Sequence, residues 1–163
     1  VPVIYENDIN AAVYGYYTRQ DSQTVQTVVG IYYPRIYGPG AGIVINKEIY
    51  KGYKNFAGEV SWLPLRPSWN EVNYDHSQEV VFMLSQIVAI YSCVLAPERI
   101  VFYGDFLTEE ILEKLMLHIQ YLLKGNFLPC IQFEKSIKKD FETGMIQIAF
   151  RELQKREGKV EWY

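Results

Sequence analysis

The sequence predicts an α/β domain in which a mixed sheet carries helices on both faces. Short apolar segments rich in β-branched residues alternate with longer segments whose apolar residues recur every three or four positions. An early pair of strands joined by a tight turn adds antiparallel pairing to this alternation. The chain has 163 residues, which is enough for one domain with a single hydrophobic core.

The first part of the chain predicts a strand, a helix and a second strand. Val1 to Tyr5 is short, apolar and β-branched, as in a buried strand. Asn7 or Asp8 then caps a helix. The apolar positions of that helix have the spacing of one buried face: Ile9, Ala12, Val13, Tyr16 and Tyr17. After a polar turn, Gln20 to Gln23, the run Val25 to Tyr33 predicts a central strand. Because the chain begins inside a predicted strand and without Met, we expect it to be a piece of a longer protein.

The rest of the chain continues the alternation. The predicted elements are a strand over Gly42 to Asn46 with a return at Ile49 and Tyr50, a helix from a capping box at Asp75 to about Leu95, a strand over Arg99 to Tyr103, a helix capped by Thr108 and ended by Gly125, a strand over Cys130 to Phe133, and a helix over Asp140 to about Arg156. The last helix should turn five residues inward: Phe141, Met145, Ile148, Ala149 and Leu153. The loop Ser61 to Asp75 is long enough that we expect it to be functional or to cover part of the core.

Composition excludes several kinds of protein. Apolar residues make up 49% of the chain and charged residues 21%, values typical of a globular domain. A net charge of −3 argues against direct binding of this chain to a nucleic-acid backbone. No apolar run reaches membrane-spanning length and no signal peptide pattern is present, so we expect no membrane partner and a cytoplasmic location. Cys93 and Cys130 stand in apolar surroundings and predict buried free thiols, without a disulfide or a metal site.

The residues with chemical potential surround a glycine-rich stretch. Gly38, Gly40 and Gly42 let backbone approach a ligand or another backbone, although such a loop alone is weak evidence of function. Asp8 follows a predicted strand at the mouth of a helix, where α/β sheets bind ligands. Its carboxylate is either a general base toward a substrate hydroxyl or a simple helix cap, and the motif alone favours the cap. Glu59, after a second glycine turn, either binds sugar hydroxyls or is a solvated surface acid.

The order and spacing of several motifs resemble one known family. The motifs are Glu6-Asn7-Asp8 followed by Asn10-Ala11-Ala12, the glycine-rich strand Gly38 to Asn46, the turn Ala57-Gly58-Glu59, and Ala96-Pro97-Glu98-Arg99-Ile100-Val101. In degenerate form they resemble the C-terminal half of the ROK family, which comprises bacterial sugar kinases and sugar-responsive repressors. The resemblance spans nearly the whole chain. It implies an actin-like ATPase (ribonuclease H-like) fold, with residues 1–163 as a single C-terminal domain and the N-terminal part of the protein absent.

On the sugar side, the resemblance implies a role for three residues. Asp8 matches the catalytic base, and Asn7 and Glu59 match sugar-binding positions. The family's usual Gly and His after the Glu are replaced by Ser61 and Trp62. Trp62 either stacks on a sugar or plugs the pocket, and the plug is slightly favoured. The family's zinc-binding Cys-x-Cys-Gly-x-x-Gly-Cys is absent, so we expect no metal.

On the nucleotide side, the resemblance implies a damaged site. Gly38, Gly40 and Gly104 match nucleotide-binding positions. The Gly and Thr that open the family's phosphate loop are replaced by Ile36-Tyr37, which supply neither bare backbone nor a small hydroxyl. Tyr103 precedes Gly104 where the family has further glycines, and we expect it to crowd the nucleoside position.

These observations predict a non-catalytic sugar-sensing and dimerisation domain of a ROK-type bacterial transcriptional regulator. Its expected partners are a sugar or sugar derivative and a second copy of the chain, with DNA read only by a helix-turn-helix module upstream of Val1. We expect this domain to need no cofactor. The alternative is the C-terminal half of an ATP-dependent, glucokinase-like sugar kinase, which needs ATP and Mg²⁺. A third possibility is a pseudo-enzyme half that mainly dimerises, with the 14 tyrosines contributing to the interface.

Overall fold

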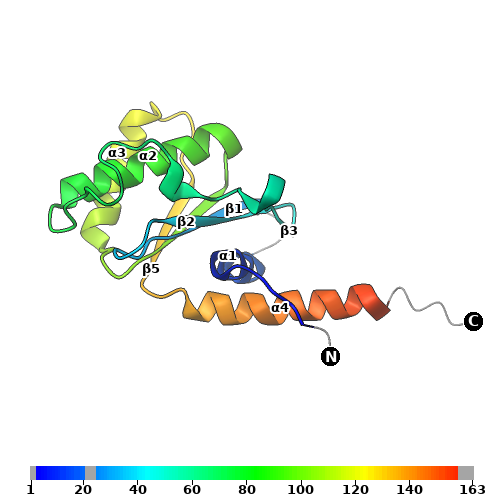
Figure 1. Cartoon of the computed structure of the whole chain (residues 1–163). Helices are drawn as coiled ribbons and strands as arrows, with labels where there is room; N and C mark the ends of the chain where they lie inside the picture. Colours follow the sequence, from blue (N-terminus) through cyan, green and yellow to red (C-terminus); the bar gives the residue numbers. More distant parts are fainter. Residues whose placement is uncertain (1–2, 21–24, 158–163) are drawn as a thin grey trace, which may run out of the picture.

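One mixed sheet lies at the centre of the molecule and carries helices on both faces (Figure 1). The computed structural model describes residues 3–20 and 25–157. The predicted strand residues 1 and 2 and the predicted turn residues 21–23 lie outside the described residues. In chain order the elements are α1 Asp8–Thr18, β1 Thr27–Tyr32, β2 Gly40–Ile45, β3 Glu48–Ile49, the short 3₁₀ helices η1 Tyr53–Asn55 and η2 Val60–Trp62, α2 Ser77–Leu95, β4 Arg99–Tyr103, α3 Glu109–Leu122, β5 Cys130–Glu134 and α4 Lys138–Glu157.

The sheet has the strand order β3-β2-β1-β4-β5. Strand β1 pairs antiparallel with β2 and parallel with β4, and β4 pairs parallel with β5. The inner residues of β1 are buried on both faces, which explains why its sequence is a continuous apolar run. Because β1, β4 and β5 run in one direction, their carboxyl ends meet at one edge, where ligands bind in open α/β sheets.

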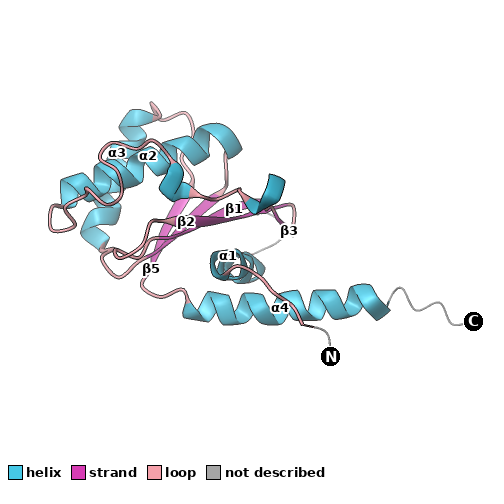
Figure 2. Ribbon diagram, in the orientation of Figure 1, coloured by secondary structure: helices cyan, strands magenta, loops and turns pink. Residues whose placement is uncertain are grey.

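Helices α2 and α3 pack on one face of the sheet, and α1 and α4 pack on the other (Figure 2). Within the described residues, α2 is the one helix long and apolar enough to cross a membrane. Half of its apolar window is buried inside the fold. Met83, Leu84 and Ile87 are fully buried in the core on that face. Such burial is typical of the core helix of a globular domain.

Two glycines bring α1 and α4 into direct backbone contact. A Cβ added to Gly144 of α4 would overlap the carbonyl oxygen of Ala11, and one added to Gly15 of α1 would overlap that of Asp140. No side chain fits between the two helices at this crossing. The two glycines therefore fix how closely α1 lies against α4.

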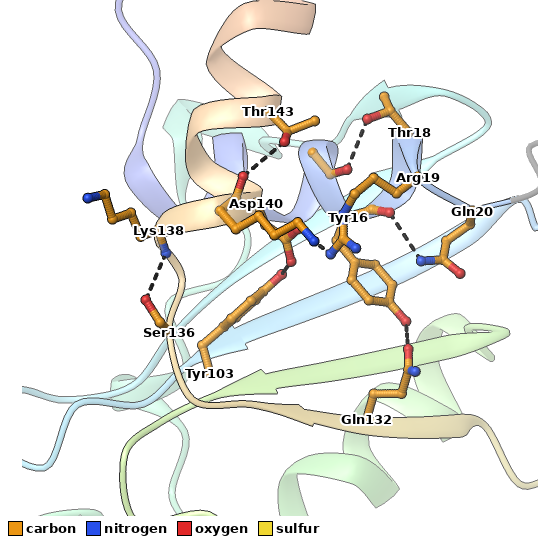
Figure 3. A network of polar contacts seen from close by, with 12 residues as sticks. Tyr16, Thr18, Arg19, Gln20, Tyr103, Gln132, Ser136, Lys138, Asp140 and Thr143 are labelled. Atoms are coloured by element: carbon orange, nitrogen blue, oxygen red, sulfur yellow. Dashed lines mark hydrogen bonds and ion pairs between the residues drawn. The ribbon is translucent and has the colours of Figure 1, made fainter.

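A buried carboxylate joins the same two helices to the sheet (Figure 3). Asp140, in the first turn of α4, is 2% exposed. The Tyr103 hydroxyl at the end of β4 donates to it over 2.8 Å, and Arg19, just after α1, forms an ion pair with it. Nearby, the Tyr16 hydroxyl of α1 donates to Gln132 of β5. Because a buried carboxylate is costly unless it is paired, these bonds hold the C-terminal end of α1 in place.

The predicted strand at the start of the chain is wrong for its described residues. Residues 3–5 form no strand, and the side chains of Val3 and Tyr5 are 70% and 88% exposed. The sheet of described residues ends at β3 on one side and β5 on the other, so this segment has no neighbouring strand. Without one, its backbone N–H and C=O groups have no ladder partner.

The predicted capping box at Asp75 is also wrong. Helix α2 has His76 at its N-cap position, with no side-chain cap hydrogen bond. The Asp75 amide instead donates to the Asn73 side chain over 3.0 Å, and the Asn73 amide donates to Glu79 over 3.0 Å. These local bonds form a turn around Asn73, which delays the start of the helix.

Three positions predicted to be buried are exposed. Cys93 of α2 and Cys130, the first residue of the edge strand β5, are exposed free thiols. Leu153 is 48% exposed because the last turns of α4 extend beyond α1 (Figure 1). Apolar neighbours in sequence do not reveal whether another element covers a position.

Replacing Gly144 with alanine should destabilise the fold, because the new methyl group would overlap the Ala11 carbonyl. We expect the free energy of unfolding to fall by about 1–3 kcal/mol, the usual cost of overpacking. Urea denaturation followed by circular dichroism measures the change. Gln147→Ala, at an exposed position of the same helix, is the matched control and should shift stability by less than about 0.5 kcal/mol. Wild-type stability in G144A would contradict the close helix crossing.

Stability should also fall at alkaline pH, partly through Tyr103. Burial, with a further contribution from the Asp140 carboxylate, raises the pKa of the Tyr103 phenol well above its usual value. Above about pH 10 the unfolded chain therefore loses this proton while the folded chain keeps it. The folded state then binds more protons, so the free energy of unfolding decreases as pH rises. Urea denaturation at stepped pH should show a shallower decrease for Tyr103→Phe than for wild type; parallel curves would rule out this contribution.

Candidate functional site

A cavity of about 370 Å³ lies where the N-terminus of α1 meets the glycine-rich hairpin. Its walls come from the segment that leads into α1, from the first residues of β2, and from the loop that follows β3. Asn7 and Glu59, both predicted to bind sugar, line this cavity, and Gly40 lines it as well. The structure therefore brings together three of the predicted site residues from distant parts of the sequence.

Asn7 stands at the cavity because it caps α1. Its side-chain oxygen accepts from the amide of Ile9 over 3.0 Å and, more weakly, from the amide of Asn10 over 3.4 Å. These bonds satisfy two amides that the helix itself leaves free. The prediction that Asn7 or Asp8 caps the helix is confirmed, and the capping residue is Asn7.

Glu59 stands at the cavity because of a tight contact at Gly58. Gly58 has φ of +94°, and a Cβ there would overlap the carbonyl oxygen of Ala41. The Ala41 amide donates to the Gly58 carbonyl over 2.7 Å. Glycine is therefore required both for the backbone angle and for the close approach to β2. The contact fixes the loop on β2 and leaves the exposed Glu59 carboxylate at the cavity.

Asp8 lies beside the cavity and is not part of its wall. Its side chain is exposed, and its carboxylate accepts from the amide of Ile9 over 2.7 Å. This is a helix-terminus bond of the kind that favours an acid in the first turn. The catalytic role implied for Asp8 stays a prediction.

An ion pair that sequence reasoning missed forms part of the same cavity. The Lys51 ammonium lies 2.8 Å from the Glu6 carboxylate, whose side chain is only 8% exposed. The other Glu6 oxygen accepts from the Asn7 amide over 3.1 Å and from the Asn10 side-chain amide over 3.2 Å. The pair links α1 to the loop after β3. The triplet motif singled out Glu6, but no sequence period relates it to Lys51.

A second cavity, of about 550 Å³, lies at the carboxyl ends of β1 and β4. Gly104 and Ile36 line it together with Lys135 of the segment before α4. Arg35 and Asp105 form an ion pair of 2.9 Å in its wall. The hydrogen bond from Arg35 holds the pKa of Asp105 below its usual range. This acid therefore stays ionised and bound to Arg35 at neutral pH.

The three glycines predicted for the nucleotide site lie in three different environments. Gly40 faces the first cavity, and a Cβ there would meet nothing within 4 Å. Gly104 lines the second cavity. At Gly38 a Cβ would lie 2.6 Å from the Ser61 side chain and 3.1 Å from Trp69. The long loop thus covers Gly38, and the structure does not unite the three glycines in one cradle.

Four bulky residues were predicted to disturb the site, and two of them, Trp62 and Tyr103, lie elsewhere than expected. Trp62 is 76% exposed and does not line the first cavity, so the predicted plug is wrong. Tyr103 is fully buried on the α1 and α4 face and does not crowd the second cavity. Ile36-Tyr37 are 81% and 71% exposed, with Ile36 at the edge of the second cavity.

No group of three or more His, Cys, Asp or Glu residues that could hold a metal ion gathers anywhere in residues 3–20 or 25–157.

Comparison with known proteins confirms the resemblance for the first part of the chain. Residues 1–68 match the model of the ROK family. The search of curated proteins finds no match.

Solved structures share the fold over most of the chain. A ROK family protein from Streptococcus pneumoniae TIGR4 in complex with sucrose matches with TM-score 0.71 and 15% identity, over 91% of this chain and 66% of that one. A ROK family glucokinase from Streptomyces griseus in complex with glucose and AMPPNP gives 0.66 and 16%, over 91% and 68%. A ROK family transcriptional regulator, a homologue of the E. coli MLC protein, gives 0.63 and 18%, over 90% and 52%. The chain therefore has the actin-like fold of ROK proteins and spans between about half and two thirds of these structures.

Asn7→Ala should remove the cap of α1 and lower the free energy of unfolding by about 1 kcal/mol, within the 0.5–2 kcal/mol range of N-cap losses. The amides of Ile9 and Asn10 would lose their side-chain acceptor. Asn7→Asp keeps an acceptor oxygen and is the matched control, with stability close to wild type. Thermal and urea denaturation measure both variants. An alanine variant as stable as the aspartate variant would contradict the capping role.

Proposed function

We propose that this chain, whose residues 1–68 are ROK family sequence, is a sugar-sensing and dimerisation domain of a ROK-type transcriptional regulator that does not phosphorylate its ligand. The separation of the three glycines expected to hold a nucleotide is the observation that carries this proposal. Gly38 is covered, Gly40 belongs to the first cavity and Gly104 belongs to the second.

The first cavity supports the sugar-sensing part of the proposal. It gathers the Asn7 and Glu59 side chains with the Asn10 amide, so donors and acceptors for several hydroxyl groups converge on one space. A sugar bound there would contact α1 through Asn7 and the loop after β3 through Glu59. Because both segments are held on β2, a bound sugar would stabilise this one arrangement of the cavity.

The second cavity supports the loss of phosphoryl transfer. A phosphate cradle uses bare backbone N–H groups and a small hydroxyl. Here the loop between β1 and β2 presents Arg35, which is engaged with Asp105, followed by the exposed Ile36-Tyr37. At these two positions the loop lacks the Gly and the Thr that open the family's phosphate loop.

The kinase alternative rests on Asp8, the first residue of α1, which directly follows Asn7. In that reading Asp8 takes the proton from a sugar hydroxyl, and the reaction needs ATP, Mg²⁺ and the family's first phosphate loop, which lies in a domain outside this chain. A solved ROK glucokinase and a solved ROK regulator both share the fold, so fold similarity favours neither reading.

Dimerisation, DNA binding and location belong to the same proposal. We expect a homodimer, to which exposed aromatic residues such as Tyr121 would contribute contact area. Because this chain has a net charge of −3, we expect a separate helix-turn-helix module to bind DNA. Such a regulator would work in the cytoplasm.

A ligand panel tests the function. Sucrose, glucose and N-acetylmannosamine are added in turn to the protein, and thermal unfolding is recorded. A sensed sugar at about 100 times its Kd should stabilise the protein by about 2.7 kcal/mol. Glu59→Gln should reduce this stabilisation strongly, whereas Glu113→Gln, an exposed acid on α3, should retain it. Stabilisation by none of these sugars would contradict the sensing function. ATP turnover by the protein that Asp8→Asn abolishes would establish the kinase alternative.

A further inference from the structure

The first cavity contains a cation that is already neutralised. Among the charged residues that line it, Lys51 is the cation, and Glu6 and Glu59 are the anions. Lys51 lies 2.8 Å from the nearly buried Glu6 carboxylate. Neither residue was assigned a role by the motifs, and neither is needed for the helix cap, which Asn7 provides.

The remaining charge of the cavity is negative. Within the described residues, the Glu59 carboxylate forms no hydrogen bond or ion pair, and Asp8 adds a second exposed carboxylate beside the cavity. A ligand that enters the cavity therefore meets an unpaired acid and no free cation. An anionic group would be repelled, whereas neutral hydroxyl groups can donate to Glu59 and accept from asparagine amides.

We propose that the Glu6–Lys51 pair makes the cavity select neutral polyhydroxy ligands and reject phosphorylated or otherwise anionic ones. This inference deepens the proposed function, because it names the class of sugar that the site accepts. The Glu6 carboxylate neutralises the Lys51 ammonium, and removing that carboxylate leaves the ammonium without this partner.

A single substitution of Glu6 can remove the charge that pairs with Lys51 and still keep the other hydrogen bonds of this side chain. In Glu6→Gln the side-chain oxygen can still accept from the Asn7 amide and the Asn10 side chain. The charge that holds Lys51 is gone, so the ammonium is free to pair with a phosphate group. The substitution should therefore convert a cavity that rejects anions into one that binds them.

The experiment compares glucose, glucose 6-phosphate and inorganic phosphate by isothermal titration calorimetry. Wild type should bind glucose at least about tenfold more tightly than glucose 6-phosphate and should not bind phosphate measurably. Glu6→Gln should shift the ratio of the two sugar affinities toward glucose 6-phosphate by about tenfold or more and should gain phosphate binding. The double variant E6Q/K51M should lose this gain. In the matched control E6Q/K54M, which removes an exposed lysine of the same loop that does not line the cavity, the gain should remain.

Each outcome is decisive. Wild type that binds glucose 6-phosphate as tightly as glucose overturns the proposal, even if the variants do not fold. So does folded E6Q that gains no phosphate binding, or a gain that survives loss of Lys51. If no sugar binds but E6Q gains phosphate binding through Lys51, the charge pairing stands and the sugar-sensing function fails.

Discussion

The position of α1 between two backbone surfaces is the constraint on which the candidate site depends. On one side, Gly42 of β2 leaves no space for a side chain, because a Cβ there would lie 2.7 Å from the carbonyl oxygen of Ile9. On the other side, Gly144 of α4 meets the carbonyl of Ala11 in the same way. Contacts between backbones cannot be relieved by a rotamer change. The helix N-terminus, with Asn7 and Asp8, is therefore held at a fixed place relative to the sheet.

The opposite wall of the cavity is fixed on the same strand. Gly58 packs on the backbone of Ala41, one residue before the glycine that receives α1. Strand β2 thus positions both Asn7 and Glu59, although they lie 52 positions apart in the sequence. This explains why the glycine-rich stretch is central to the molecule. Gly42 and Gly58 bring other backbone segments close to β2, whereas Gly40 leaves its Cβ side open.

Sequence patterns were sufficient for the architecture and for part of the site. Continuous apolar runs predicted β1 and β4, and the resemblance of two short motifs to ROK proteins selected Asn7 and Glu59, because each of these signals is local in sequence. The orientation of Tyr103 was not predictable in this way. It depends on which face of the sheet receives each residue of β4, and on the presence of Asp140 across the core. The Glu6–Lys51 pair is likewise a contact between distant segments that share no periodicity.

Ile36 and Tyr37, in the loop between β1 and β2, can change without disturbing this framework. The side chains of Ile36-Tyr37 are exposed, and the loop that carries them takes no part in the contacts of Gly42, Gly58 or Gly144. Substitutions at Ile36 and Tyr37 therefore cost little stability, whereas a side chain at any of those three glycines would displace a backbone. A protein that no longer transfers phosphate would lose the loop motif first and keep the glycines that hold α1 and the first cavity. The exposed Ile36-Tyr37 and the closely packed Gly42, Gly58 and Gly144 follow that pattern, and our proposal of a domain without phosphoryl transfer is consistent with it.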